Sequence, residues 1–425
     1  MSSIKVVGGK QLKGEIKIQG SKNAALPVIA ATILNKGITI LRNCPKILDV
    51  FHMINILVEL GCKTSWDGNI LTIDSTDITT PVVSEASVRK MRSSILYMGA
   101  LLGRCREVTI AYPGGCSIGK RPIDYHLDAI GKMNVTEELD RDGEIIHCYT
   151  NEILGNDIFL EFPSVGATQN VILTAVLSTG KTRIYNAARE PEVAELCNYL
   201  NKAGAMICGG GTSYIEIVGV KELHDTTYTL MPDRIVAGTY MTAIAATYGD
   251  GIFTDFPTKE LETVVQVLRK IGCKIEDLGD GVRISCSSRL ESIKLLKTQP
   301  YPGFPTDMQS QMMTVLSLAK GVSTIAEEIF ESRFQNAYEL GKMGANIIIS
   351  AEDNRAIIAG VEELHGAVVK SHDLRGGAAL VIAGLCAKGT TIIQEATSIE
   401  RGYEDICRDF SELGADIKYC SENAS

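Results

Sequence analysis

One pattern recurs about six times along the chain, at intervals of roughly 60 to 75 residues. Each copy opens with a helix of small apolar residues and passes through a turn into a β-rich segment. An amphipathic helix that ends at a glycine follows, and then a last strand. Because a repeated unit of this size cannot bury its apolar face alone, the copies must pack against one another. This periodicity constrains the fold more than any other feature of the sequence.

The β-rich segments are easily recognised. Most begin at or near a glycine and continue with β-branched residues, which is typical of a turn leading into a strand. They are predicted at residues 36–40, 107–110, 180–184, 250–254, 320–325 and 388–393.

The ends of the amphipathic helices repeat as well. Glycine at this place favours a left-handed residue that closes the helix, and asparagine is its usual substitute. We therefore predict left-handed residues at Gly61, Gly204, Gly272, Gly344, Gly414 and, in the remaining copy, Asn134.

The two kinds of helix differ in their surfaces. The first helices, such as 23–34, 171–177, 236–246 and 378–386, carry little polar surface and are expected inside the protein. The second helices, such as 263–271, are amphipathic and are expected outside. The sequence therefore predicts an α/β fold with sheets around buried helices, in two similar lobes of three copies each. A cleft between such lobes would be the default ligand site.

Charge and cysteine usage exclude several classes of protein. The chain has 425 residues, which suits two or three domains, and a net charge of −9, so no bulk attraction to nucleic acid or anionic membrane is expected. Its 12 cysteines are scattered, without a C-x-x-C pair or a histidine at ligand spacing. This argues against a zinc site or a disulfide framework and for a reducing cytoplasm. Most of them, such as Cys273 and Cys407, are expected to be buried. We expect neither a signal peptide nor a membrane span.

The segment 113–122 is the most unusual loop. It places Cys116 among glycines and prolines and next to Lys120 and Arg121. Nearby cations favour a reactive thiolate and attract anions. The residues alone leave two interpretations open, a reactive loop or a surface turn with a buried cysteine. The segment also begins like a phosphate-binding P-loop, but Arg121 stands where Ser or Thr should hold magnesium, so we set that interpretation aside.

Polar residues gather where the first helices begin. Helix N-termini present free N–H groups and a positive dipole end, which suit phosphate or carboxylate. The clusters lie at Ser21–Asn23, Arg92, Ser164–Gly166, Asp233, Asp307 and Asp373–Arg375, and further arginines follow the strands at Arg189, Arg333 and Arg401. For each single aspartate a helix cap is a better interpretation than catalysis. Together the clusters indicate an enzyme with a multiply anionic small substrate, a reactive thiol and carboxylates that can act as bases.

These motifs resemble the enolpyruvyl transferase family along nearly the whole chain, from Gln19 to Glu404. The most specific matches are Pro113-Gly114-Gly115-Cys116 with Arg121-Pro122, residues 304–309 and residues 187–192. The resemblance implies a two-lobed inverse α/β barrel built from six β-α-β-α-β-β units. It places one lobe, with the cysteine loop, at 22–231, the other at 1–21 plus 232–425, and the active site in the cleft between them.

The resemblance also implies a reaction. The enolpyruvyl group of phosphoenolpyruvate would pass to the 3′-hydroxyl of UDP-N-acetylglucosamine, with release of phosphate, by addition and elimination through a tetrahedral intermediate. This would be the first committed step of peptidoglycan synthesis, in the cytoplasm, and a target of fosfomycin at the loop cysteine. The resemblance implies no cofactor, no metal, and no nucleic-acid or membrane partner.

Site residues follow from the resemblance position by position. Cys116 matches the proton donor and Asp307 the candidate base. Cations that hold phosphoenolpyruvate match Lys22, Arg121 and Arg401, and the first and last of these also count among the catalytic residues. The UDP-sugar site matches Asn23, Arg92, Pro122, Ile123, Asp124, Tyr125, Ser164, Val165, Gly166 and Ile329. Further polar residues of the cleft match Arg333, Asp373 and Arg375.

Three positions depart from the family pattern. Phe162 stands where some members have a lysine beside the diphosphate, Leu96 replaces an aromatic residue, and Lys120 adds a charge next to Arg121. Rival hypotheses are the sibling enzyme that acts on shikimate 3-phosphate, which lacks the Pro-Gly-Gly-Cys loop, and an RNA 3′-phosphate cyclase, which the acidic composition disfavours. A paralogue that only binds ligands is disfavoured by the intact Lys22, Cys116, Asp307 and Arg401.

Overall fold

The computed structural model describes residues 3–114, 123–140 and 142–420. The described residues divide into two compact units. Those up to Gln19 and from Pro232 onward form the first unit, and those from Gly20 to Met231 form the second unit. Each unit has its own continuous apolar core.

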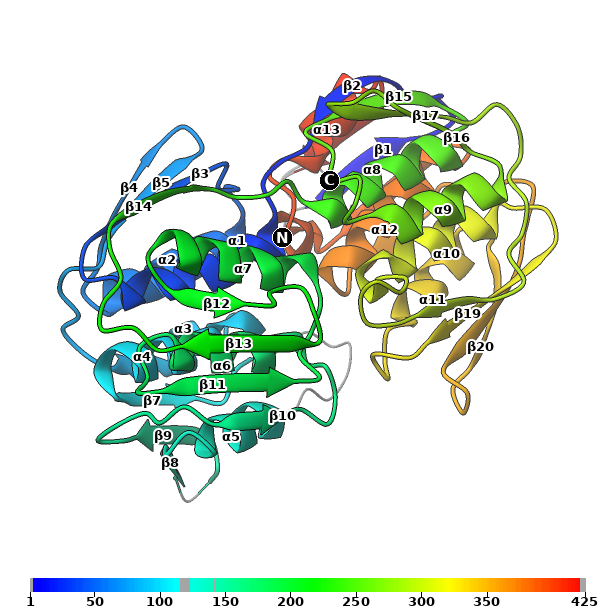
Figure 1. The fold of residues 1–425 in the computed structure, drawn as a ribbon. Coiled ribbons are helices and arrows are strands. Elements are labelled where there is room, and N and C mark those ends of the chain that lie inside the picture. The colour runs from blue at the N-terminus through cyan, green and yellow to red at the C-terminus, as the bar shows by residue number, and fades with distance from the viewer. Residues whose placement is uncertain (1–2, 115–122, 141, 421–425) are drawn as a thin grey trace. The chain divides into compact units, whose positions relative to one another are not determined.

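All six sheets of the described residues share one topology (Figure 1). A short strand runs parallel to a middle strand, whose other edge pairs antiparallel with the inner of two further strands. In five sheets these two strands form a hairpin, and in the sixth they are β1 (Ser3–Val7) and β24 (Asp416–Cys420), which lie near opposite ends of the chain. With one helix after the short strand and one after the middle strand, each unit of the repeat reads β-α-β-α-β-β. This confirms the fold class that the sequence predicted.

The residue pattern alone was wrong in two details of the repeat. It predicted one strand after the amphipathic helix, where the structure has a hairpin, and it missed the short strand before the apolar helix. Most of the missed strands have two to four residues, and β6 (Val82–Val83) has two. So few residues cannot show the alternation by which a strand is recognised in sequence.

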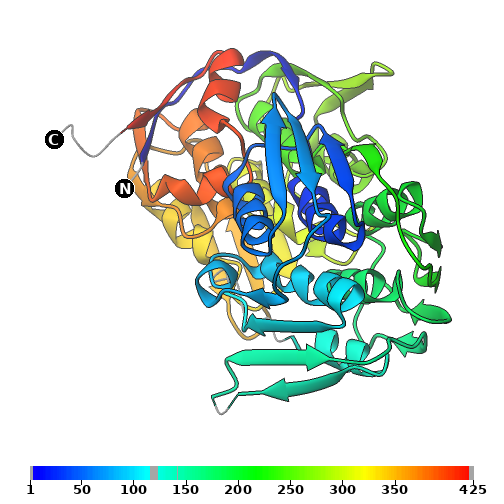
Figure 2. The same cartoon turned by 90° about the vertical axis from the view of Figure 1, so that its left-hand side faces the viewer.

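The second unit contains three of these sheets, and Figure 2 draws β3, β4 and β5 of one sheet in blue and the strands of the other two in cyan to green. Its strands are β3 (Ile38–Arg42), β4 (Lys63–Asp67), β5 (Ile70–Asp74), β6, β7 (Glu107–Ala111), β8 (Thr136–Leu139), β9 (Ile145–Tyr149), β10 (Asp157–Phe159), β11 (Lys181–Tyr185), β12 (Met206–Cys208), β13 (Tyr214–Val218) and β14 (Thr226–Thr229). Its helices are α1 (Lys22–Ala31), η1 (Thr32–Leu34), α2 (Leu48–Glu59), α3 (Glu85–Val88), η2 (Arg92–Ile95), α4 (Leu96–Cys105), α5 (Asp124–Gly131), α6 (Val165–Ala175) and α7 (Pro191–Lys202).

The first unit repeats the arrangement. Its strands are β1 (Ser3–Val7), β2 (Lys13–Lys17), β15 (Asp250–Thr254), β16 (Lys274–Asp277), β17 (Gly281–Ser285), β18 (Leu296–Thr298), β19 (Val322–Glu327), β20 (Asn346–Ser350), β21 (Arg355–Ala359), β22 (Val368–Lys370), β23 (Thr390–Gln394) and β24 (Asp416–Cys420). Its helices are α8 (Arg234–Ala246), α9 (Glu262–Ile271), η3 (Thr306–Met308), α10 (Gln309–Ser317), α11 (Gln335–Lys342), α12 (Leu374–Cys386), η4 (Ala396–Arg401) and α13 (Ile406–Glu412).

Three strands complete sheets far from their place in the chain. β14 runs parallel to β3, which lies almost two hundred residues earlier. At the N-terminus, β1 pairs with both β23 and β24, and β2 pairs with β15. These pairings explain why the first residues of the chain belong with the unit that begins at Pro232.

Helix burial follows the predicted division. All 13 residues of α8 are buried, and of α12 every residue except Cys386 is buried. Helix α9 instead buries Val264, Val265, Leu268 and Ile271, which lie on one face at helical spacing.

The predicted left-handed residues are confirmed. The five glycines that end amphipathic helices have φ between 88° and 120°, and Asn134 has φ 66°. No helix in the described ranges has both the length and the hydrophobicity needed to cross a lipid bilayer.

Candidate active site

Of the cysteine loop, residues 113–122, the structure describes Pro113 and Gly114. A side chain there would collide with the backbone, since an added Cβ would lie 1.8 Å from Arg89 O. Glycine is therefore required where the loop leaves β7. Cys116, Arg121 and Pro122 lie outside the described residues, so their assigned roles stay predictions.

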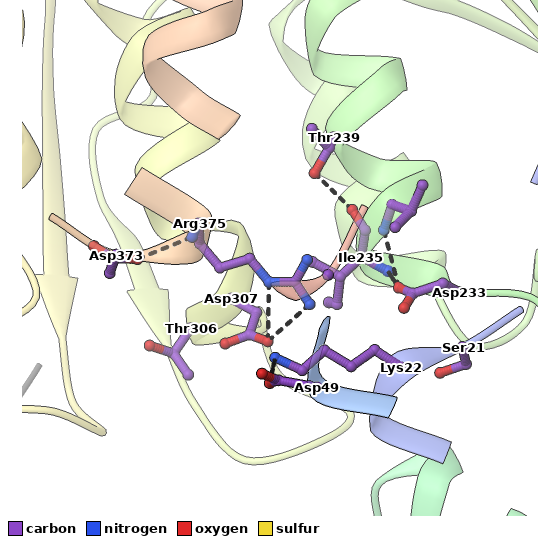
Figure 3. Close-up of polar contacts among 12 residues, drawn as sticks. Ser21, Lys22, Asp49, Asp233, Ile235, Thr239, Thr306, Asp307, Asp373 and Arg375 are labelled. Carbon is purple, nitrogen blue, oxygen red and sulfur yellow. Dashed lines mark hydrogen bonds and ion pairs between the residues drawn. The ribbon is translucent and has the colours of Figure 1, made fainter. Parts of the chain in front are cut away.

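Lys22 is the first residue of α1 and forms an ion pair with a buried carboxylate. Ser21 caps this helix by accepting a hydrogen bond from Ala24 N at 3.3 Å. Lys22 Nζ lies 2.7 Å from Asp49 Oδ2, and the two side chains are only 11% and 2% exposed (Figure 3). The opposite charges favour the charged form of each other. Lys22 thus carries a fixed ammonium group at a helix N-terminus, next to Asn23.

Arg92 and the start of α6 come together around a histidine. The Arg92 guanidinium stands over the Tyr112 ring, 5.7 Å from its centroid. His126 is buried, and burial together with the charge of Arg92 lowers its pKa to about 3. An added Cβ on Gly166 would meet His126 Cε1 at 2.8 Å, so the ring lies directly against the first turn of α6.

The proton on His126 can be assigned from its partner. Asn170 Oδ1 accepts a hydrogen bond from Gly99 N at 2.9 Å, which makes Nδ2 the donor toward His126 Nδ1 at 2.7 Å. Neutral His126 therefore carries its hydrogen on Nε2, on the side of Gly166. Ser164 caps α6 by accepting from Ala167 N at 3.3 Å.

Apart from Asn23 in α1 and Pro122, which lies outside the described residues, the predicted UDP-sugar residues of the second unit form two groups. In the first, Ser164, Val165 and Gly166 form the N-terminus of α6, and Arg92 lies close enough to His126 to lower the pKa of this histidine. Ile123, Asp124 and Tyr125 lie at the start of α5, where Ile123 is buried and Asp124 is exposed. Both groups touch His126, which the sequence analysis did not select.

Asp307 lies in η3 between two buried arginines. Its Oδ1 accepts from Arg333 Nη2 at 2.8 Å. Its Oδ2 lies 3.4 Å from both Nε and Nη2 of Arg375, and Figure 3 shows this second contact. The arginine side chains are 4% and 3% exposed, whereas that of Asp307 is 28% exposed. The structure therefore brings three predicted site residues together, with the carboxylate as the exposed member.

Arg375 belongs to a second chain of contacts. Its Nη1 donates to Tyr403 Oη at 3.3 Å, and Tyr403 Oη lies 2.8 Å from Thr239 Oγ1. Burial opposes the charge on Arg375, but Tyr403, Asp307 and Asp233 outweigh it, so its pKa lies above the ordinary value. Arg375 is therefore a permanent cation.

A buried carboxylate links Asp307 to Ile329. Glu327, at the end of β19, accepts from Thr306 Oγ1 at 2.9 Å and from the backbone N of Ile329 at 3.0 Å. Thr306 Oγ1 in turn accepts from Arg333 Nη1 at 2.8 Å. Glu327 thus fixes the residue before Asp307 together with the predicted UDP-sugar contact Ile329. Glu327 was not predicted as a site residue because nothing in the sequence of this strand distinguishes it.

Two other aspartates are helix caps, as predicted. Asp233 Oδ1 accepts from the backbone N of Ile235 and Val236, and Asp373 Oδ1 accepts from those of Arg375 and Gly376. Arg401 ends η4, in the same segment as Tyr403. Asp307, Ile329, Arg333, Asp373, Arg375 and Arg401 all belong to the first unit, and the other described site residues to the second. The expected cleft between lobes stays a prediction.

Comparisons with known proteins extend over nearly the whole chain. A sequence profile of the family described as EPSP synthase (3-phosphoshikimate 1-carboxyvinyltransferase) matches residues 6–410. A Caldanaerobacter subterraneus subsp. tengcongensis protein named UDP-N-acetylglucosamine 1-carboxyvinyltransferase 2 is 46% identical over 417 residues, which are 98% of this chain and 99% of that protein.

Two further similarities agree with these. A Finegoldia magna protein named UDP-N-acetylglucosamine 1-carboxyvinyltransferase is 44% identical over 423 residues, 98% of this chain and 99% of that protein. The solved structure of the enolpyruvyl transferase NikO from Streptomyces tendae has a TM-score of 0.89 at 23% identity and covers 99% of both chains. At that identity the likeness shows the fold.

Proposed function

The chain belongs to the EPSP synthase (3-phosphoshikimate 1-carboxyvinyltransferase) family, and we propose that it transfers the enolpyruvyl group of phosphoenolpyruvate to UDP-N-acetylglucosamine. The observation that carries this choice of acceptor is the identity of 44 to 46% with enzymes of that name over 98% of the chain. The protein is accordingly a UDP-N-acetylglucosamine 1-carboxyvinyltransferase, a transferase of peptidoglycan synthesis. Both substrates are cytoplasmic metabolites, so the proposal places the reaction in the cytoplasm.

The reaction needs an acid, a base and fixed cations. In the addition step the 3′-oxygen bonds to C2 of phosphoenolpyruvate while C3 gains a proton. In the elimination step C3 loses a proton and the C2–O bond to phosphate breaks. We assign the proton donor to Cys116, and the cations for phosphate and carboxylate to Lys22, Arg121 and Arg401. The ion pair with Asp49 supports this role of Lys22, because it fixes the position of the ammonium group before substrate binds.

The surroundings of Asp307 define what this carboxylate can do. Two guanidinium groups favour its ionised form and hold both oxygens. Such a carboxylate is well placed to accept a hydrogen bond but is a weak base. We therefore propose that Asp307 orients the 3′-hydroxyl and takes its proton only as the new C–O bond forms. Arg333 and Arg375 act through Asp307 and are positioning residues.

The nucleotide part of the acceptor suits the start of α6. The free N–H groups of its first turn and the nearby charge of Arg92 favour a diphosphate. The proposal adds Ile123, Asp124, Tyr125 and Asn23 from the second unit, and Ile329 and Asp373 from the first. Because Asp373 Oδ1 is used in capping α12, only its second oxygen can serve a ligand.

An acceptor comparison tests the proposal. Purified protein is given phosphoenolpyruvate with either UDP-N-acetylglucosamine or shikimate 3-phosphate, and the products are identified by mass spectrometry. We expect an enolpyruvyl ether of the UDP-sugar and none of the shikimate compound. An enolpyruvyl product from shikimate 3-phosphate alone would instead assign the chain to the activity for which the family is named.

A further inference from the structure

Two cysteines of the first unit face each other across a strand pair. Strands β16 and β17 are antiparallel, with Lys274 opposite Ser285 as their outermost partners. One step further in the same register, Cys273 lies opposite Cys286. Both residues are 5% exposed. They follow α9 and β17 respectively.

The backbone hydrogen bonds show which kind of pair this is. Cys286 N–H donates to Gly249 O at 3.0 Å, away from β16, and Cys273 N–H donates to Leu268 O at 3.0 Å. Neither N–H is used between the two cysteines, so they form a non-hydrogen-bonded pair. In such pairs the Cα atoms lie about 4.5 Å apart and the side chains approach most closely. A disulfide spans Cα distances of about 4.4 to 6.8 Å.

Both thiols point into the same core. Side chains alternate between the faces of a sheet, so Cys273 shares a face with Ile275 and Cys286 with Ile284, and both isoleucines are buried. Cys286 Sγ also lies 3.2 Å from Ser288 O. A hydrogen bond with Cys273 lowers the pKa of Cys286, and the same contact raises the pKa of Cys273. Cys286 is therefore the thiol that ionises first.

We propose that Cys273 and Cys286 form an oxidation site that closes to a disulfide when a peroxide reaches it. The Cys286 thiolate attacks one peroxide oxygen, the O–O bond breaks, and sulfenic acid and hydroxide result. The Cys273 sulfur then attacks the sulfenic sulfur, the S–O bond breaks, and its proton leaves with the oxygen as water. Two thiols lose two electrons and one peroxide becomes two waters. The bond joins the end of α9 to β17.

The test detects peptides joined by a disulfide and does not measure enzyme turnover, so oxidation of Cys116 does not affect the result. Wild-type protein is treated with hydrogen peroxide, free thiols are alkylated, and the protein is digested with trypsin. Cleavage separates the two cysteines, into residues 271–274 and 284–289. We expect a species that joins these two peptides and that a reductant splits.

Variants make the assignment specific. Cys273→Ser should abolish the joined species, whereas Cys208→Ser, at an exposed cysteine of the second unit, should leave it unchanged. The proposal fails if wild-type Cys273 and Cys286 are both recovered alkylated at a peroxide dose that oxidises Cys208. It also fails if Cys286 goes to sulfinic or sulfonic acid without forming the link.

Discussion

Arg333 Nη2 lies 2.8 Å from Asp307 Oδ1, and the Nη1 of the same guanidinium lies 2.8 Å from Thr306 Oγ1. One planar fork therefore holds two consecutive residues of η3. A lysine could supply the charge but only as a single point, so it cannot reproduce both bonds. The orientation of Asp307 depends on the shape of Arg333 as well as on its charge.

This relationship predicts the effect of Arg333→Lys. We expect kcat to fall by about tenfold to a hundredfold, since small misplacements of reacting groups carry such losses. The KM for phosphoenolpyruvate should change little. Arg283→Lys, at an arginine that is 46% exposed and bound to Asp250, is the matched control and should keep wild-type kcat. Steady-state phosphate release measures both. A wild-type kcat in Arg333→Lys would contradict the positioning role.

Asp307 itself should separate turnover from binding. We predict that Asp307→Ala and Asp307→Asn both reduce turnover by about 10² to 10⁴, the range that loss of a positioned base gives. Binding of the UDP-sugar, measured by calorimetry, should survive in part because the α6 contacts remain. Normal turnover by either variant would reject the assignment.

The Lys22–Asp49 pair predicts a stability effect. Asp49→Asn leaves a buried ammonium group without its opposite charge, which costs about 3 to 5 kcal/mol of unfolding free energy in comparable cases. Urea unfolding measures the loss. The control Asp67→Asn replaces an exposed aspartate of β4 and should change stability by less than about 0.5 kcal/mol. Equal stability of the two variants would show that Asp49 does not support Lys22.

From the low pKa of His126 we predict that the folded protein loses stability in acid. Its pKa of about 3 lies below the ordinary value of 6.5, so below pH 6.5 the unfolded chain binds a proton that the folded protein excludes. Stability from this residue is fully present above pH 6.5 and is lost toward pH 3, at about 1.4 kcal/mol per pH unit.

Unfolding at pH 7 and pH 5 checks this. His126→Gln should lose about 2 kcal/mol less than wild type between the two pH values. His365→Gln, at a side chain that is 61% exposed, should lose as much as wild type. Equal losses in His126→Gln and wild type would mean that His126 titrates normally.

Phe162 predicts a gain of affinity. It is 39% exposed, and its carbonyl accepts from Ser164 N at 2.7 Å, so it lies beside the start of α6. Phe162→Lys adds a cation there and should lower the KM for the UDP-sugar several-fold at low salt, with less effect at high salt. Leu154→Lys, at another exposed apolar residue of the second unit, should leave KM unchanged.

Local rules predicted much of the fold. The left-handed residues at Gly272 and Asn134 follow from the steric demands of helix ends, and the burial of α8 follows from its lack of polar surface. The short strand β6 escaped prediction because two residues carry no periodic signal. Parallel pairing of β14 with β3 also depends on packing between distant segments, which no local pattern reports.

Site residues could likewise be predicted where their partners are close in the sequence, but not where the partners are distant. The cap interpretation is confirmed for Asp233 and Asp373, which accept hydrogen bonds from backbone N–H groups two and three residues further along the chain. Asp307 differs because its partners lie 26 and 68 residues away. Asp49 and Glu327 were not predicted for that reason, since the role of each depends on a contact with a residue that is distant in the sequence.

The most direct test of the central claim is phosphate release from phosphoenolpyruvate, with and without UDP-N-acetylglucosamine, for wild type and Cys116→Ser, each with and without fosfomycin. We expect phosphate release that depends on the UDP-sugar, that fosfomycin blocks in wild type, and that is insensitive to fosfomycin at whatever rate Cys116→Ser retains. Release that is independent of the UDP-sugar, or no release in its presence, would show that the protein does not catalyse the proposed transfer.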